Sequence, residues 1–174
     1  MDRSQINTAL REHHEAFIVR TLAVPVEARD RSMNGKWTAA QQLEHIKRAT
    51  APVAMALVVP KWFLRWRFGR PNRTPRDYDA LVERYKEKLA AGGRASGRFV
   101  PPMIPASAVD PIVADLRRII ATMEKRVDNW SEEELDRYLL PHPLLGKLTV
   151  REMLFFTIHH AQHHQALVER DYPA

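Results

Sequence analysis

The sequence predicts an all-α protein, a four-helix bundle with one short extra helix and one long loop. Three observations indicate this fold class. Several segments begin with helix-capping motifs, and apolar residues within them recur at intervals of three and four. No segment shows a convincing strand-like alternation of apolar and polar residues, although residues 97–104 could be extended. Amphipathic helices of this kind bury their apolar faces against one another, which favours a bundle.

Six helices are expected from their start and stop signals. In chain order they lie near residues 3–23, 38–59, 75–91, 110–129, 131–139 and 149–170. Capping boxes, in which Ser or Thr caps one amide and a Glu or Gln reaches back for another, stand at Thr38, Ser131 and Thr149. A capping residue followed by Pro at the first helical position stands at Thr74 and Asp110.

The segment after the third helix is expected to be a covering loop. Gly92-Gly93 is a helix stop signal, and residues 92–108 are rich in Gly and Pro and long for a connection in a bundle. Within the helices, apolar residues share one face. These are Ile6, Leu10, Phe17 and Thr21 in the first helix and Ile112, Leu116, Ile119, Met123 and Val127 in the fourth.

Length and composition exclude several classes of protein. A chain of 174 residues suffices for one core, so a single domain over residues 1–174 is expected. The net charge of +6 is small for this length and alone indicates no nucleic-acid partner. The absence of cysteine excludes disulfides, thiolate metal sites and a sulfur nucleophile from the protein. No apolar run is long enough to span a bilayer and the N-terminus lacks a secretion signal, so we expect a cytoplasmic protein.

Four of the eight histidines fall within residues 159–164, inside the last expected helix. Residues four apart share a helical face, so the run contains two pairs, His159/His163 and His160/His164. A rotation of 100° per residue places His160 and His164 on the apolar side and the other pair with Gln162 on the opposite side. Two core imidazoles need partners, which a divalent metal or buried waters and carboxylates would supply. Ala161 stands where a zincin protease needs Glu, which excludes that class.

A third metal ligand should come from another helix that faces the interior. His45 is the best candidate, because it precedes a core-type residue in a well-capped helix. His13 follows it, although a hydrogen-bonded core histidine is the favoured interpretation there. His14 and His142 are expected to be surface or loop residues.

Three motifs together resemble the DinB-like superfamily of helical bundle proteins. Lys36-Trp37-Thr38 followed by His45 resembles the opening of that superfamily's second helix, and residues 148–152 followed by His160-x-x-x-His164 resemble its last helix. The stretch from Phe68-Gly69-Arg70-Pro71 to Phe99-Val100-Pro101 is similar to one branch, so the resemblance covers nearly the whole chain.

The resemblance implies a function as well as a fold. It implies one divalent metal held by His45, His160 and His164 with open coordination positions, and commonly a homodimer. Leu167 replaces a Gln that often follows the last histidine, so the resemblance supplies no hydrogen-bond partner for His164. It also implies metal-dependent hydrolysis, or transfer of a low-molecular-weight thiol, on a small electrophilic substrate.

Nitrogen ligands suit zinc, nickel, iron(II) and cobalt better than magnesium or calcium, and zinc is the first expectation, with nickel or iron next. No catalytic base is assigned, because Glu44 points away from His45 on its helix and is interpreted as a solvated carboxylate. The alternatives to an enzyme are a non-catalytic metal-binding bundle and a basic-aromatic peripheral binding protein.

The basic-aromatic segment, residues 61–73, interleaves Trp and Phe with one Lys and four Arg. Three interpretations are a surface for single-stranded nucleic acid, an interfacial membrane anchor, and a helix end whose aromatic side chains pack on the bundle while the arginines reach solvent. We favour the third, so no nucleic-acid partner is favoured. If Trp62 and Trp66 are exposed, a dimer interface is another use for them.

Overall fold

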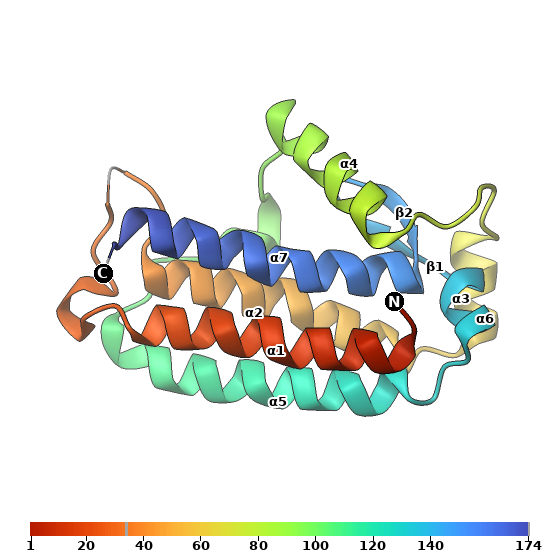
Figure 1. Cartoon of the computed structure of the whole chain (residues 1–174), viewed down its shortest axis with the longest axis horizontal. Coiled ribbons are helices and arrows are strands. Elements are labelled where there is room, and N and C mark those ends of the chain that lie inside the picture. Colours follow the sequence, from red (N-terminus) through yellow and green to blue (C-terminus); the bar gives the residue numbers. More distant parts are fainter. Residues whose placement is uncertain (34, 174) are drawn as a thin grey trace.

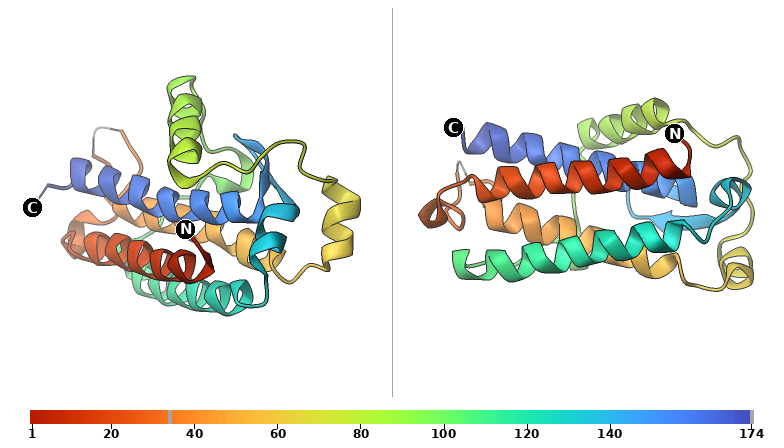
Figure 2. Two further views of the ribbon diagram at one scale, coloured as in Figure 1. Left: turned by 45° about the vertical axis from the view of Figure 1, so that its right-hand side comes forward. Right: turned by 60° about the horizontal axis from the view of Figure 1, so that its bottom comes forward.

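Four long helices form the body of the molecule in the computed structural model, which describes residues 1–33 and 35–173. They are α1 (Arg3–Leu22), α2 (Ala39–Ala56), α5 (Val109–Val127) and α7 (Val150–Asp171). Helix α1 packs against α5 and α7, and α2 packs against the same two helices, so the four enclose one interior (Figures 1 and 2). The predicted all-α four-helix bundle is confirmed.

Shorter elements surround one end and one side of this bundle (Figure 1). They are the helices α3 (Lys61–Phe68), α4 (Tyr78–Ala90) and α6 (Glu132–Arg137), the 3-10 turns η1 (Val26–Ala28), η2 (Gly97–Phe99) and η3 (Ala106–Ala108), and the strands β1 (Leu139–His142) and β2 (Gly146–Thr149). None of the helices in the described part of the chain is long and apolar enough to cross a membrane.

The antiparallel hairpin β1–β2 was not expected from the sequence. It pairs Leu139 with Thr149 and His142 with Gly146. Each strand has four residues, which is too short for an alternating pattern to stand out, and the turn depends on Gly146 at a φ of 77°. The stretch expected to be extended, residues 97–104, instead begins with the turn η2.

The capping motifs placed three helix starts correctly. Thr38, Ser131 and Thr149 each accept a hydrogen bond from the amide three residues on, and the Gln or Glu at that position returns one to the cap. Asp2 caps α1 in the same way.

Two predicted capping residues were wrong, although each helix begins within three residues of its expected position. Helix α4 begins at Tyr78 and is capped by Asp77, whose carboxylate accepts from the Ala80 amide, rather than by Thr74. Helix α5 begins at Val109 without a side-chain cap, because the turn η3 leads directly into it, and Asp110 lies in its first turn. The stop signal at Gly92-Gly93 was correct, since α4 ends at Ala90.

Helix α3, which forms the first part of the basic-aromatic segment, has one buried face and one exposed face. Leu64 is buried in the core, whereas Trp62 and Trp66 are 71% and 74% exposed. The expectation that these tryptophans pack on the bundle was therefore wrong. The cause is that α2 ends at Ala56 and a separate helix begins after Pro60. The spacing of four residues places Trp62 and Trp66 on the same face of this helix, which is its outer face.

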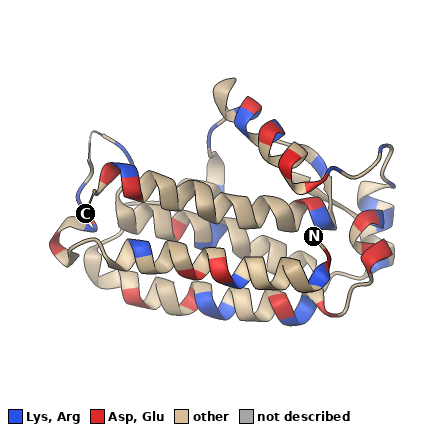
Figure 3. Ribbon diagram, viewed as in Figure 1, with Lys and Arg blue, Asp and Glu red and all other residues tan. Residues whose placement is uncertain are grey.

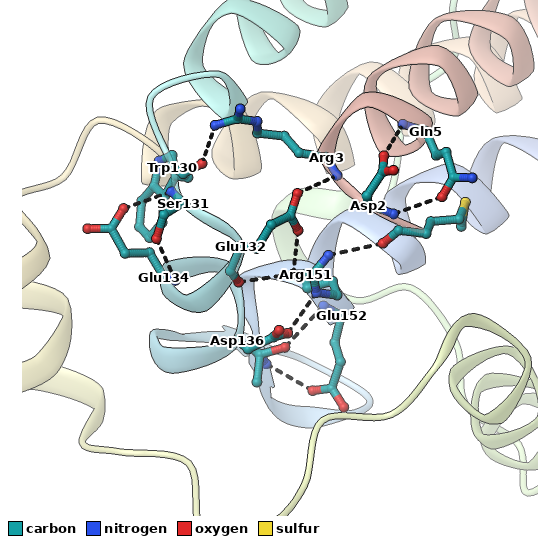
Figure 4. A network of polar contacts seen from close by, with 12 residues as sticks. Asp2, Arg3, Gln5, Trp130, Ser131, Glu132, Glu134, Asp136, Arg151 and Glu152 are labelled. Carbon is teal, nitrogen blue, oxygen red and sulfur yellow. Dashed lines mark hydrogen bonds and ion pairs between the residues drawn. The ribbon is translucent and has the colours of Figure 1, made fainter.

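Charged side chains hold the ends of the bundle together. Figure 3 shows both signs of charge on α1, α4 and α5, whereas the middle of α7 carries none. At one end, Arg3 donates to the carbonyl oxygens of Asp128 and Trp130, and Arg151 binds Glu132 and Asp136 (Figure 4). These contacts tie the start of α1 to the segment between α5 and α6, and the start of α7 to α6.

The core forms two apolar clusters along the bundle axis. On α7 the first cluster holds the buried apolar residues from Val150 to Ile158, and the second cluster begins at Ala161. On α2 the second cluster ends at Ile46 and the first begins at Val53. The junction between the clusters is where the uncharged middle of α7 presents its histidines to α2.

Candidate metal centre

Three histidine side chains from two helices meet at this junction. The Nε2 atom of His160 lies 3.1 Å from Nε2 of His45 and 3.0 Å from Nε2 of His164. All three side chains are buried, with exposures of 4%, 6% and 5% for His45, His160 and His164. The predicted pairing of His160 with His164, and the choice of His45 from another helix, therefore describe one cluster.

The helix starts fix where these rings lie. Thr38 caps α2 seven residues before His45, and Thr149 caps α7 eleven residues before His160, so each histidine lies well inside its helix and among buried neighbours. The spacing of four residues places His164 on the same face of α7 as His160.

Two of the rings are oriented by hydrogen bonds from their other nitrogen. Nδ1–H of His45 donates to the carbonyl oxygen of Phe99 at 2.7 Å, and Nδ1–H of His164 donates to Oε1 of Gln42. With the proton held on Nδ1, the Nε2 atom of each neutral ring presents a lone pair to the centre. Phe99 belongs to residues 92–108, so the expectation that this loop covers something is confirmed.

The arrangement of the three Nε2 atoms suits a bound metal ion better than it suits hydrogen bonds among the rings themselves. Nε2 of His160 carries at most one proton and can donate to only one of its two neighbours at 3.0–3.1 Å, which leaves the Nε2 lone pair of the other neighbour without a donor from His160. A buried arrangement of that kind is unfavourable unless a cation lies between the nitrogens. Imidazole nitrogens bound to zinc at about 2.0–2.1 Å with tetrahedral angles would lie about 3.3 Å apart, close to these separations.

Burial favours the neutral form of all three rings. Desolvation lowers the pKa of His45, against the opposing effect of its bond to Phe99. Desolvation together with repulsion between the rings lowers the pKa of His160 and His164 well below the usual value. Neutral imidazole is the form that ligates transition metals, so these residues would be ready to bind without first losing a proton.

The histidines line a cavity of about 860 Å³. Its walls come from α2, α3, α4, α7, the β1–β2 turn and the segment before Val100. A volume of this size is typical of sites that enclose a small molecule. Tyr85 of α4 also lines it, and burial raises the pKa of its hydroxyl to about 12, so the group stays protonated as a hydrogen-bond donor.

Trp37 lies over the cluster. Its ring centroid is 4.9 Å from that of His45, and its ring is nearly parallel to that of His164 at 6.4 Å. The indole therefore shields the rings from the side that α2 leaves open, which gives a physical reason for a tryptophan directly before the helix cap.

Four other residues weighed in the sequence lie outside the cluster. His13 receives a hydrogen bond from Nε2 of Gln162 at 3.0 Å, in line with the favoured interpretation. His14 is 1% exposed, so its expected surface position was wrong; helix α1 turns it inward, where Nδ1–H donates to the carbonyl oxygen of Leu10. His142 was also misplaced, because the unexpected hairpin brings it against Phe156 in the cavity wall.

Glu44 is a further correction. It points away from the cluster as expected, but it is buried rather than solvated. Lys47 and Arg48 each place a nitrogen 2.7 Å from its carboxylate. A carboxylate engaged by two cations on its own helix is structural, and among the described residues no Asp or Glu joins the histidine cluster.

His159 and His163 are turned away from the cluster but not into solvent. Helix α4 covers them, with the Tyr85 ring 5.9 Å and 5.8 Å from the two histidine rings. Sequence reasoning had no signal for this cover, or for Phe99 as a partner of His45. Gln42 could have been found, because it precedes His45 by three residues and so shares its face of α2.

Comparison with known proteins gives one finding. The family model described as the DinB superfamily matches residues 9–168. A search of curated proteins and one of solved structures gave no match. The matched region contains both helices of the histidine cluster and spans nearly all of the bundle. The chain therefore belongs to the DinB superfamily.

Proposed function

We propose that the chain is a metal-dependent enzyme that acts on a small electrophilic substrate by hydrolysis or by transfer of a low-molecular-weight thiol. His45, His160 and His164 would hold one divalent transition metal. The observation that carries the proposal is the convergence of three neutral Nε2 atoms in the wall of a large cavity. A site built only for stability would not need room for a second molecule beside the ligands.

A divalent metal bound here would lower the pKa of a coordinated water or thiol and so supply a nucleophile at neutral pH. The protein's own residues have separate tasks. Gln42 and the Phe99 carbonyl hold the rings of His164 and His45 in the ligating tautomer, and Trp37 packs against the ring of His45 at the cavity wall. The protonated hydroxyl of Tyr85 is available to donate a hydrogen bond to a substrate oxygen.

Zinc is the metal that we propose first, with nickel or iron(II) as alternatives, because all three accept a set of imidazole nitrogens. If the reaction is thiol transfer, the thiol must be a separate molecule, since the chain contains no cysteine.

We further propose a homodimer in which α3 contributes to the interface. Four exposed apolar side chains from the end of α2, the connection that follows it and α3 would be covered by a partner copy: Met55, Val58, Trp62 and Trp66. Sedimentation at micromolar concentration should show a dimer, and Trp62→Glu with Trp66→Glu should convert it to a monomer. A monomeric wild-type protein would contradict this.

Metal binding is tested by elemental analysis and by zinc and nickel titration of the purified chain. The wild type should bind one metal per chain, and His45→Ala and His160→Ala should each bind at least 100-fold more weakly. His159→Ala is the matched control, being the same substitution one residue earlier on α7 but turned away from the cluster, and it should bind like the wild type. Failure of the wild type to take up either metal would overturn the proposal.

Catalysis is tested separately with the zinc-loaded protein. Hydrolysis is followed with 4-nitrophenyl esters, and thiol transfer with monobromobimane in the presence of free L-cysteine. At least one reaction should exceed the rate measured with His160→Ala. If neither does while metal is bound, the chain is a non-catalytic metal-binding bundle rather than an enzyme.

A further inference from the structure

The cavity beside the histidines is far more apolar than a metal centre requires. Its lining includes side chains from four helices: Val53, Phe63, Phe68, Leu89, Met153 and Phe156. Helix α3 contributes to the wall although it lies outside the four-helix body (Figure 1). A cavity that held only a metal, a water and a small polar molecule would not need aromatic side chains from so many elements.

Apart from its histidines, the ionisable side chains that line the cavity and carry charge at neutral pH are basic. Arg94 and Arg98 belong to the lining and are exposed, so they stand at its mouth, and among the described residues the lining contains no Asp or Glu. The guanidinium of Arg98 lies over the ring of Phe99, the residue whose carbonyl orients His45. The cavity therefore combines buried nitrogens, apolar walls and a cationic rim.

We propose that the substrate is an anionic amphiphile: a small molecule with an apolar body that the walls enclose and an acidic group that the arginines attract. This rests on the proposed function, because it concerns the substrate of the same site. The buried body contributes affinity by leaving water. The rim arginines contribute a weaker, salt-dependent preference for negative charge, since they are exposed.

Chain-length dependence tests the apolar body. Butanoate, hexanoate and octanoate are titrated calorimetrically into the full chain, both zinc-loaded and metal-free. The affinity should rise about fourfold per added methylene, the factor that corresponds to ~0.8 kcal/mol per buried CH₂. An affinity that does not change with chain length would overturn the proposal.

A filled cavity should remove that dependence. Ala49 lines the cavity one turn after His45, so Ala49→Phe places a ring where the chain would lie. In this variant the increase in affinity from butanoate to octanoate should be mostly lost, whereas the metal content should stay at the wild-type value. Ala114→Phe, at an exposed position of α5, is the matched control and should behave like the wild type. An equal gain in both variants would place the binding elsewhere and overturn the proposal.

The acidic group is tested on metal-free protein, so that a carboxylate cannot bind the metal. Octanoate should bind a few-fold more tightly than octylammonium at low salt, and Arg94→Gln combined with Arg98→Gln should abolish the difference. Equal or tighter binding of octylammonium by the wild type would overturn this part. Because these titrations do not require metal, a chain that takes up no zinc would refute the proposed function and still give a decisive result here.

Discussion

At the scale of single residues, the ability of the cluster to bind a metal depends on hydrogen bonds made on the outer side of two of its rings. His45 and His164 each give their Nδ1 proton to an oxygen, one from the backbone of residues 92–108 and one from Gln42. That proton placement decides which nitrogen has a free lone pair. A ring without its partner can rotate or change tautomer, and a metal bound at the cluster would then lose a ligand.

Gln42→Ala should lower metal affinity without removing a ligand. Loss of an oxygen that orients a ligating histidine typically costs 10–100-fold in affinity, so we expect a zinc dissociation constant higher by that factor, measured by competition with a chelator. Gln42→Glu keeps an acceptor oxygen and should bind near the wild-type value. Equal affinity in all three proteins would show that Gln42 does not orient His164.

His14 should make the metal-free protein sensitive to acid. Burial lowers its pKa from 6.5 to about 4, so the unfolded chain takes up a proton that the folded chain refuses. Stability is therefore complete above pH 6.5 and falls as the pH drops from 6.5 toward 4. Between pH 8 and pH 5 this amounts to about 2 kcal/mol of unfolding free energy.

Urea unfolding of His14→Gln at these two pH values checks this effect. The loss of stability from pH 8 to pH 5 should be about 2 kcal/mol smaller than in the wild type. A loss of stability from pH 8 to pH 5 that is the same in His14→Gln and in the wild type would contradict this account.

At the scale of elements, the start of α7 is fixed by a buried carboxylate. Glu152 is 0% exposed; it completes the capping box with Thr149 and accepts two hydrogen bonds from Arg73 and one from the Arg76 amide. Burial alone would raise its pKa, but the bonds to Arg73, Arg76 and Thr149 bring the pKa below its usual value. The side chain thus ties the segment before α4 to the helix that carries two of the histidines.

Glu152→Ala should destabilise the fold strongly. Its removal leaves the amides of Thr149 and Arg76 and the guanidinium of Arg73 without their acceptor, and each unpaired group of this kind typically costs about 1–3 kcal/mol when it is buried. Glu83→Ala on α4 removes a carboxylate whose ion pair with Lys86 is exposed at both ends, and should change stability by less than about 1 kcal/mol. Similar changes in the two unfolding free energies would contradict the structural role of Glu152.

The sequence predicted those elements whose signals are local. A capping box lies within four residues, so the starts at Thr38, Ser131 and Thr149 were readable. The capping residue of α4 could not be predicted in this way. Asp77 and Thr74 are both possible caps, and which of them is used depends on where the chain leaves α3. The exposed position of Trp62 and Trp66 depends likewise on the separate direction of α3, which no local pattern encodes.

At the scale of the whole molecule, the bundle brings His45 to within bonding distance of residues more than 100 positions later. Helical periodicity was enough to predict that His160 and His164 face inward. The choice of His45 rather than His13 as the third residue of the cluster required knowing which helix faces His160 across the interior, and that helix is α2. The contact with Phe99 could not be predicted at all, because residues 92–108 have no regular period and take their course from the surface that they cover.

Residues 92–108 contribute to the site in two ways. The segment carries Arg94 and Arg98 in the cavity lining, and the carbonyl oxygen of Phe99 orients the ring of His45. The fold supplies the rigid part of the site through α2 and α7, and the added elements supply the walls. This division agrees with the general tendency of scaffolds to hold the reactive groups while connections set the specificity.

X-ray absorption spectroscopy of the zinc-loaded protein tests the central claim most directly. Three imidazole nitrogens should appear in the first coordination shell at about 2.0–2.1 Å, with the remaining shell made of light, exchangeable atoms. His160→Ala should show fewer imidazole ligands, and His159→Ala should give the wild-type spectrum. A wild-type spectrum with one imidazole or none, or one changed equally by both substitutions, would contradict the three-histidine centre.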